Sequence, residues 1–372
     1  MGFLPPERDP GLLPVLLWAR MRHMASTYHR VRATLAALAT LALLAPAAGA
    51  STLVIEGAGD GHGVGMSQDG ALGYAEHGWN DAQILAHYYT GTTLGQAPAS
   101  FVVKVLVGSK VEKVPLERYV RGVVSAEMPS SWPLAALEAQ AIASRTYALT
   151  DDAGGTRFDV YADTRSQMYV GVAAETAATN AAVAATSGQI VEYDGRPAVT
   201  YYFASSGGMT ENIENSFMGA EPEPWLKAVP DAYETKASDW KLSMSFASAA
   251  ARLSGLVRGS FRGIEVLKRG VSPRIVTAEV LGSRGATDVS GPELEARLGL
   301  DSAWAYFSVK NGTSVRREPD VSGQAPFTLA APESPPPVPA TPTTSPQGGA
   351  PAPATPAATA ASTSATGGVQ AG

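Results

Sequence analysis

Cysteine is absent from the 372-residue sequence, and histidine occurs only five times. Without thiols the chain can form neither a disulfide nor a metal site built on thiolates. The remaining candidate metal ligands are Asp60, His62, His77 and His87. Their spacing matches no helical zinc motif. We therefore predict no bound metal and no cofactor.

Positive charge is also scarce, since 28 lysines and arginines stand against 34 aspartates and glutamates. The resulting net charge of −6 argues against nucleic acid and anionic membrane surfaces as partners. Neutral or zwitterionic polymers stay open as partners, and nothing in the composition fixes an oligomeric state.

The apolar segment near the amino end, residues 33–45, is too short to cross a bilayer comfortably. It follows two arginines and precedes the small-residue triplet at residues 48–50, which is the order of a secretory signal peptide. We predict that residues 1–50 are a signal peptide cleaved near Ala50 and that the protein is exported. An uncleaved membrane anchor is the alternative.

Charge nearly disappears at the carboxyl end, where residues 321–372 are rich in proline, alanine, threonine, serine and glycine. Such a segment buries too little apolar surface to offset its chain entropy, so we predict a disordered tail. Residues 51–320 remain for a folded domain, and this length is ample for a sizeable core.

Helix-like and strand-like segments are mixed with hairpins along this domain, which predicts an α+β fold of helices and antiparallel strands. Asn80 and Gln83 form a capping box that starts one helix. Asp194-Gly195 between two β-rich runs predicts a type I′ hairpin turn. We expect further helices at residues 116–126, 131–149, 176–186, 245–253 and 292–298, and strands at residues 52–55, 101–107, 189–193, 196–203, 264–268 and 275–281.

Glu127 is the strongest candidate for a catalytic residue. It lies among valine, alanine and methionine side chains, and partial burial raises the pKa of a carboxyl group. Pro115 suits a helix start and Pro129 ends the helix, so Glu127 lies at the carboxyl end, where the helix dipole disfavours an anion. A carboxyl that keeps its proton near neutral pH can act as a general acid. A solvated helix-end carboxylate is the alternative.

The next helix carries polar residues on one stripe at i, i+4 and i+7, namely Gln140, Ser144 and Tyr147. Arg145 lies among small residues of the same helix, from which its guanidinium could reach a cleft. A purely structural arginine is the alternative for this position.

Residues 57–65 are rich in glycine and follow a strand, but their spacing matches neither the dinucleotide-binding motif nor the P-loop. Alternating glycines let the backbone approach a ligand or another segment closely. His62 within the run and Gln68 beyond it could therefore bind a polar ligand. A tight structural loop with a satisfied histidine is the alternative.

Ser205-Ser206-Gly207-Gly208 raises the question of a nucleophilic serine, but it does not match the nucleophile-elbow motif. A small polar turn that presents hydroxyls and amides to a ligand is favoured. Thr210 extends this polar surface.

Several long motifs together resemble the stage II sporulation protein D (SpoIID) family, also called amidase-enhancer LytB-like. They begin with Leu116-Glu-Arg-Tyr-Val-Arg-Gly-Val-Val-Ser-Ala-Glu-Met-Pro129 and Pro133-Leu-x-Ala-Leu-x-Ala-Gln-Ala-x-Ala-x-Arg-Thr-Tyr147. Further stretches agree at residues 163–180, 203–212, 61–68 and 84–89, so that the resemblance covers roughly residues 57–310. The Gly-His-Gly-Val-Gly-Met-Ser-Gln segment usually closes the family domain. Its place at the front here, within residues 57–95, resembles a circular permutation.

The resemblance implies a lytic transglycosylase that acts on peptidoglycan glycan strands, preferably strands stripped of stem peptides, in a cell-wall location. Glu127 would protonate the oxygen between N-acetylmuramic acid and N-acetylglucosamine, and then deprotonate the C6 hydroxyl to close a 1,6-anhydro ring. A glycan-binding cleft would be lined by Gln140, Arg145, Tyr147, Ser166, Gln167, Ser205, Ser206 and Thr210, with His62 and Gln68 from the permuted segment. Some relatives are thought to hold zinc through cysteine and histidine, and this chain has no cysteine.

Two other functions stay open at this point. One is a catalytically silent wall protein that binds glycan and stimulates an amidase partner, as the family's other name implies. The other is a glycoside hydrolase, which ordinarily needs two carboxylates about 5–10 Å apart. The sequence offers no obvious second carboxylate in an apolar setting comparable with that of Glu127.

Overall fold

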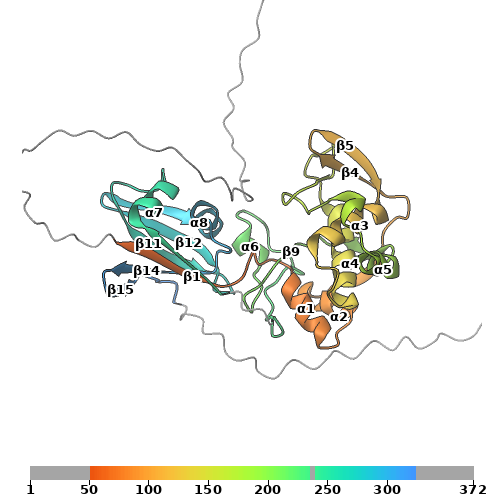
Figure 1. Ribbon diagram of the computed structural model, residues 1–372, viewed down its shortest axis with the longest axis horizontal. Coiled ribbons are helices and arrows are strands. Elements are labelled where there is room, and N and C mark those ends of the chain that lie inside the picture. Colours follow the sequence, from red (N-terminus) through yellow and green to blue (C-terminus); the bar gives the residue numbers. More distant parts are fainter. Residues whose placement is uncertain (1–50, 235–238, 324–372) are drawn as a thin grey trace, which may run out of the picture. The chain divides into compact units, whose positions relative to one another are not determined.

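The computed structural model describes residues 51–234 and 239–323 as an α+β fold, which confirms the predicted class (Figure 1). The helices are α1 (Gln68–Glu76), α2 (Asp81–Tyr88), α3 (Leu116–Glu127), α4 (Leu134–Thr150), η1 (Gly171–Ala174), α5 (Ala177–Ala185), α6 (Ile213–Ser216), α7 (Phe246–Arg252) and α8 (Gly291–Leu298). The strands are β1 (Thr52–Gly57), β2 (Met66–Ser67), β3 (Thr93–Gln96), β4 (Val102–Val107), β5 (Lys110–Pro115), β6 (Val160–Tyr161), β7 (Gln189–Tyr193), β8 (Arg196–Pro197), β9 (Tyr202–Phe203), β10 (Trp240–Ser245), β11 (Phe261–Arg269), β12 (Ile275–Gly282), β13 (Gly285–Ser290), β14 (Ala305–Asn311) and β15 (Ser314–Arg317).

Two sequence predictions fall largely outside this description. The predicted signal peptide, residues 1–50, lies outside the described residues, as does the predicted tail from residue 324 onwards. Within the described ranges, no helix is both long and apolar enough to cross a membrane.

Helices α3 and α4 follow from proline placement and from small side chains. α3 ends at Glu127 because Met128, which precedes Pro129, has extended backbone angles of −126° and 143°. α4 is buried over most of its length, since its alanines let other elements approach from several sides. α4 contacts α1, α2, α3 and α5.

One hydrophobic core joins α1 to α5 with the three-stranded sheets β5-β4-β6 and β3-β7-β8. The early segment, residues 57–95, supplies nine of its buried side chains, which are Val64, Met66, Ala71, Tyr74, Trp79, Ile84, Leu85, Tyr88 and Tyr89. This segment is therefore part of the core around α3 and α4 and is not an appendage to it.

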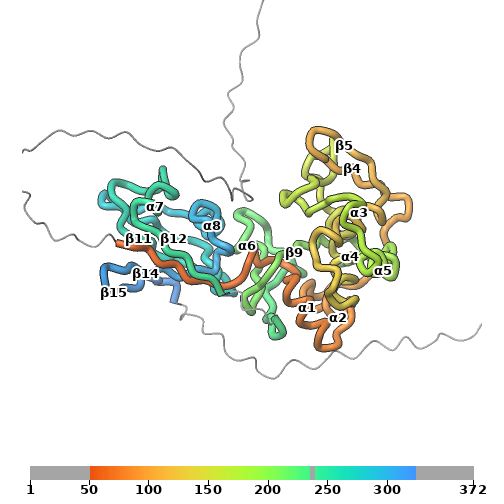
Figure 2. The backbone as a smooth tube through the Cα atoms, in the orientation of Figure 1, coloured from red at the N-terminus to blue at the C-terminus, as the bar shows by residue number. Residues whose placement is uncertain are grey.

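The predicted hairpin is correct for β7 and β8 and wrong for its last residues. Asp194 and Gly195 have positive φ angles of 50° and 70°, as a type I′ turn requires. Beyond β8 the chain leaves its partner, and Thr200 donates to the Ala143 carbonyl at 2.8 Å. β9 then pairs in parallel with β2, so that residues 202–203 lie beside the start of α1 (Figure 2).

A second core lies between the antiparallel sheet β10-β1-β14-β15, the sheet β11-β12-β13 and the helices α7 and α8. β1 pairs with β10 on one side and with β14 on the other. Its side chains alternate: Leu53 and Ile55 are buried in the core, whereas Glu56 is exposed. The sheet consequently keeps one face for solvent.

Candidate active site

The carboxylate of Glu127 is held from two sides at the end of α3. Its Oε1 accepts a hydrogen bond from the Met168 backbone amide at 2.7 Å, and Nε2 of Gln68 lies 3.4 Å from its Oε2. The same nitrogen lies 3.5 Å from the Glu127 carbonyl oxygen. Because a backbone amide can only donate, Oε1 must stay an acceptor, which leaves Oε2 as the oxygen that can carry a proton.

Burial raises the pKa of Glu127 above its ordinary value, and burial is the largest of the effects on this group. Hydrogen bonds from the Met168 amide, Gln68 and Tyr202 favour the charged form and lower the pKa, but they do not cancel the effect of burial. Glu127 therefore keeps its proton to a higher pH than a solvated glutamate. The apolar neighbours in the sequence predicted this direction.

Gln68 reaches Glu127 because of the way α1 begins. Ser67 caps the helix by accepting a hydrogen bond from the Gly70 amide at 3.1 Å, and it belongs to β2. The parallel pairing of β2 with β9 fixes this helix start next to Tyr202. One short pairing thus positions two side chains that act on the Glu127 carboxylate.

Buried glutamines near the carboxylate belong to a network of side-chain hydrogen bonds. Nε2 of Gln68 lies 3.4 Å from Oε1 of Gln140, whose own amide donates to the Ser144 hydroxyl at 2.9 Å. Gln167 donates to the Tyr119 hydroxyl at 3.0 Å and accepts from the Tyr202 hydroxyl at 2.8 Å. The structure therefore gathers three of the predicted site residues around Glu127, namely Gln68, Gln140 and Gln167.

Tyr147 and Ser166, two other predicted site residues, meet at Asp151. The Ser166 hydroxyl donates to Asp151 at 2.6 Å and accepts from the Tyr161 amide at 3.1 Å. Tyr147 also hydrogen-bonds to Asp151, and burial raises the pKa of that carboxyl. Ser166 precedes Gln167 and Met168, so this cluster anchors the segment that holds Glu127.

Arg145 is fully buried and all its N–H groups have acceptors within the fold. Two of them form a bidentate ion pair with Glu117, at 2.8 Å each, and another donates to the Gln189 carbonyl at 3.0 Å. This arrangement joins α3, α4 and β7. It favours a positioning role for Arg145 over direct contact with a ligand.

Ser205, Ser206 and Thr210 are buried, and their partners belong to the same chain. The two serine hydroxyls donate to Glu234, and the Ser206 amide donates to the same carboxylate at 2.9 Å. The Thr210 hydroxyl accepts from the Val229 amide at 2.8 Å. The hydroxyls and amide of this turn bind Glu234 in this structure, and their presentation to a ligand stays a prediction.

His62 packs against aromatic rings. Its ring centroid lies 5.0 Å from that of Phe217 and 5.4 Å from that of Phe203. Its Nδ1 accepts from the Val64 amide at 3.1 Å. Burial, and secondarily the nearby charge of Arg274, lower the pKa of His62 to about 4, so the ring is neutral at physiological pH.

Three groups of this site were missed by the sequence analysis: the Met168 amide, Tyr202 and Asp151. A backbone amide carries no residue-specific signal, so the first was out of reach. Tyr202 and Asp151 had weak signals: an aromatic run ahead of the Ser-Ser-Gly-Gly turn, and an acid at the end of a predicted helix. Among the described residues, no group of three or more histidines and carboxylates is arranged to hold a metal ion.

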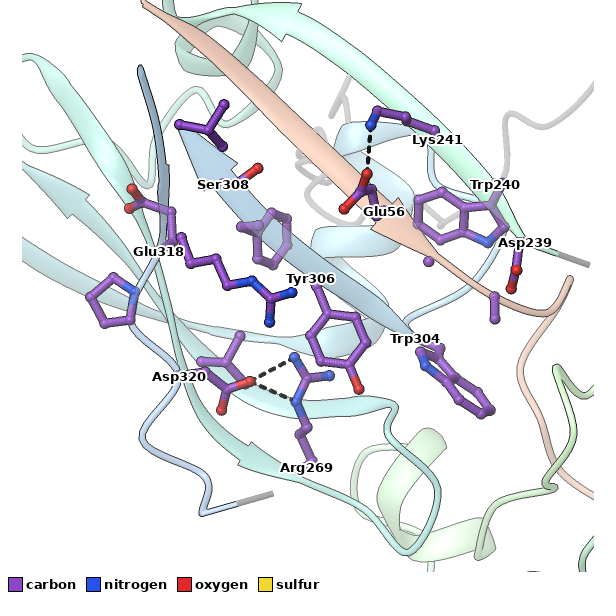
Figure 3. Close-up of a pocket in the computed structure, with 17 residues that line it drawn as sticks. Glu56, Asp239, Trp240, Lys241, Arg269, Trp304, Tyr306, Ser308, Glu318 and Asp320 are labelled. Atoms are coloured by element: carbon purple, nitrogen blue, oxygen red, sulfur yellow. Dashed lines mark hydrogen bonds and ion pairs between the residues drawn. The ribbon is translucent and has the colours of Figure 1, made fainter. Parts of the chain in front are cut away.

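A surface hollow lies elsewhere in the structure. It has a volume of about 1050 Å³ and is lined from β1, β10, β11, β14 and β15, and by the residues after β15 (Figure 3). None of its lining residues is a predicted site residue. We base the candidate active site on the hydrogen bonds and burial of Glu127, because this hollow contains no group that contacts it.

Comparison with known proteins identifies similar chains. Residues 108–193, which include Glu127, match the SpoIID family, described as Stage II sporulation protein. Stage II sporulation protein D of Bacillus subtilis (strain 168) is 30% identical over 232 residues, covering 57% of this chain and 65% of that protein. The protein of the same name from Bacillus amyloliquefaciens is 30% identical over 244 residues, covering 59% and 68%. The amidase enhancer of Bacillus subtilis (strain 168) is 38% identical over 111 residues, which cover 30% of this chain and 14% of that protein.

Proposed function

Because this chain belongs to the SpoIID family, we propose that it is a cell-wall enzyme that cleaves peptidoglycan glycan strands as a lytic transglycosylase. The names of its relatives, sporulation protein D and amidase enhancer, support a role in the cell wall. The observation that carries the enzymatic part is the state of Glu127. Its pKa is raised by burial, one of its oxygens is held by a backbone amide, and the other can carry a proton.

The first step needs an acid. Oε2 of Glu127 donates its proton to the oxygen between C1 of N-acetylmuramic acid and N-acetylglucosamine, and the C1–O bond breaks. The N-acetylglucosamine leaves with a free hydroxyl, and positive charge develops at C1 and the ring oxygen. Glu127 becomes a carboxylate at this moment, and the Met168 amide and Gln68 stabilise its charge.

The second step needs a base at the same place. The Glu127 carboxylate takes the proton of the C6 hydroxyl of the muramic residue, whose oxygen attacks C1 and closes a 1,6-anhydro ring. The acid form of Glu127 is restored, so the cycle is balanced without water. Because the substrate supplies its own nucleophile, this scheme requires a single carboxylate.

Asp151 is the carboxylate to consider for the hydrolase scheme, in which a second carboxylate acts as nucleophile or activates water. Asp151 accepts hydrogen bonds from Ser166 and Tyr147, which tie this carboxyl to the fold. We therefore assign Asp151 to holding the segment of Ser166 and Met168, and we retain the single-acid scheme.

A second candidate function is that of a non-catalytic glycan-binding protein that enhances an amidase. The relative named amidase enhancer favours it. In that case Glu127 would be a buried structural carboxylate, and the amidase would be the partner that acts on the wall.

Digestion of purified, peptide-stripped glycan strands separates these functions. The transglycosylase releases products that end in 1,6-anhydro-N-acetylmuramic acid, which mass spectrometry detects, and Glu127→Gln abolishes them. A hydrolase would give reducing ends. Absence of any cleavage by the wild type, together with retained binding of strands, would support the amidase-enhancing function.

Glu138→Gln is the matched control. Glu138 is also a partly buried helical glutamate whose pKa is raised by burial, but it lies on α4 and has no described contact with Glu127. We expect this variant to cleave strands like the wild type. Equal loss of cleavage in the two variants would remove the assignment of Glu127 as the acid.

A further inference from the structure

The solvent-facing side of the sheet β10-β1-β14-β15 is hollowed over much of its width. The hollow of about 1050 Å³ continues into a second one of about 610 Å³, and the two share Glu56, Lys241, Ser308 and Val315. A single small-molecule pocket typically measures about 300–1,000 Å³. The combined hollow therefore suits a chain-like ligand better than a small molecule.

Strand registers determine which side chains face this hollow. Lys241, Glu56 and Tyr306 form one row across β10, β1 and β14. Ser243, Val54, Ser308 and Arg317 form the next row, and Thr52, Lys310 and Val315 form the third. The face thus carries hydroxyls, charges and an aromatic ring, which are the groups that bind sugar hydroxyls and acetamido groups.

Acidic side chains of the hollow form ion pairs, whereas two of its basic side chains form none in the part of the chain that the structure describes. Glu56 is paired with Lys241, and Asp320 is paired with Arg269 at 2.8 Å (Figure 3). Glu318 is paired with Arg316 at 2.8 Å. These three carboxylates are thus neutralised within the described fold, and the exposed Asp239 also lines the hollow.

Two basic side chains of the hollow are exposed and lack such ion pairs within the described residues. Lys310 and Arg317 are exposed, and within residues 51–234 and 239–323 neither has an ion-pair partner. Ser308 lies opposite Arg317 and Val315 lies opposite Lys310, so the two cations are diagonal neighbours on one face. Two exposed cations in this arrangement suit carboxylates spaced along an extended ligand.

We infer that this hollow is a second, non-catalytic binding site for a stripped glycan strand, in which Lys310 and Arg317 bind lactyl carboxylates. The choice of ligand rests on the proposed function. Stem peptides block the lactyl group as a neutral amide, whereas their removal leaves a carboxylate on every muramic residue. The cations therefore have a lactyl carboxylate to bind on every muramic residue of a stripped strand, and the hydroxyl-bearing rows bind the neutral sugars between them.

The test uses the full chain carrying Glu127→Gln, so that bound strands stay uncleaved. Lys310→Glu and Arg317→Glu are combined in one variant. The control combines Arg262→Glu and Lys268→Glu, which make the same change in net charge at exposed positions of β11. Binding of labelled, peptide-stripped glycan strands is measured by fluorescence anisotropy at several salt concentrations, after thermal melts have established that both variants are folded.

We expect the first double variant to bind strands about tenfold more weakly, which corresponds to about 1.4 kcal/mol, and to lose much of the salt dependence. The control binds within about twofold of the parent protein. With Glu127 restored, Lys310→Glu and Arg317→Glu raise the KM for long strands and leave the cleavage of a short oligosaccharide unchanged.

Unchanged binding in the first variant, or equal loss in both, would overturn the inference. A dimer that dissociates only in the first variant, seen by sedimentation velocity, would assign the face to a second copy and would also overturn it. The binding assay needs no turnover, so failure of the proposed transglycosylase would leave this result interpretable. Loss of cleavage in Glu127→Gln with unaltered strand binding in the charge variants would preserve the proposed function alone.

Discussion

Replacing Met168 by proline removes the N–H group that donates to Oε1 of Glu127 at 2.7 Å. This hydrogen bond favours the charged form of the carboxyl and opposes the effect of burial. Its loss therefore raises the pKa of Glu127 further. Because the acid must be protonated to cleave the glycosidic bond, the basic limb of the pH–rate profile moves to higher pH.

The size of the effect follows from the geometry. A short hydrogen bond to a charged group contributes about 1.5–3 kcal/mol, and about 1.4 kcal/mol corresponds to one pKa unit. We therefore expect the basic limb to move up by about 1–2 pH units. The bond from Gln68, at 3.4 Å, is longer, so Gln68→Leu should move the limb in the same direction by less.

The assay is kcat/KM for stripped strands between pH 4 and pH 9, with release of anhydro ends as the readout. Met168→Ala is the matched control, since it shortens the side chain and keeps the backbone amide. A proline variant that melts like the wild type and keeps the wild-type basic limb would refute the idea that this amide tunes the acid. A shift of equal size in the alanine variant would do the same.

Three other results are expected. Because the pKa of Glu127 is raised in the folded state, this state binds more protons than the unfolded state above about pH 4.5, and stability falls as the pH rises from there. Glu127→Gln should therefore melt at a higher temperature than the wild type at pH 7. This difference in melting temperature should close by pH 4. Glu117→Gln leaves the buried Arg145 without a counter-ion and should cost about 3 kcal/mol in urea unfolding, near the low end for such changes because the Glu117 side chain is 34% exposed. Deletion of residues 57–95 removes nine core side chains and should abolish cooperative thermal unfolding, and a sharp melt of the truncated protein would contradict this.

Local rules explain what could be predicted of the fold. Pro115 and Pro129 set the limits of α3, and the Asn80 capping box starts α2, because these signals act within a few residues of themselves. The same local reasoning placed Glu127 at a helix end with apolar neighbours. It succeeded because burial is the largest effect on the pKa of this carboxyl.

Long-range pairing explains what could not be predicted. Tyr202 was expected to continue a hairpin, but its strand pairs with residues 66–67, far away in the sequence. Arg145 could reach a cleft or be structural as far as the sequence shows, and in the structure Glu117 from the preceding helix binds its guanidinium inside the fold. Both outcomes depend on how distant segments pack, and periodicity within one segment does not encode that.

The pairing of β2 with β9 joins two segments that lie on opposite sides of Glu127 in the sequence. Gln68 and Tyr202 both act on the Glu127 carboxyl, so its surroundings are complete only when this contact has formed. A substitution that weakens the pairing would therefore change the titration of the acid without touching it.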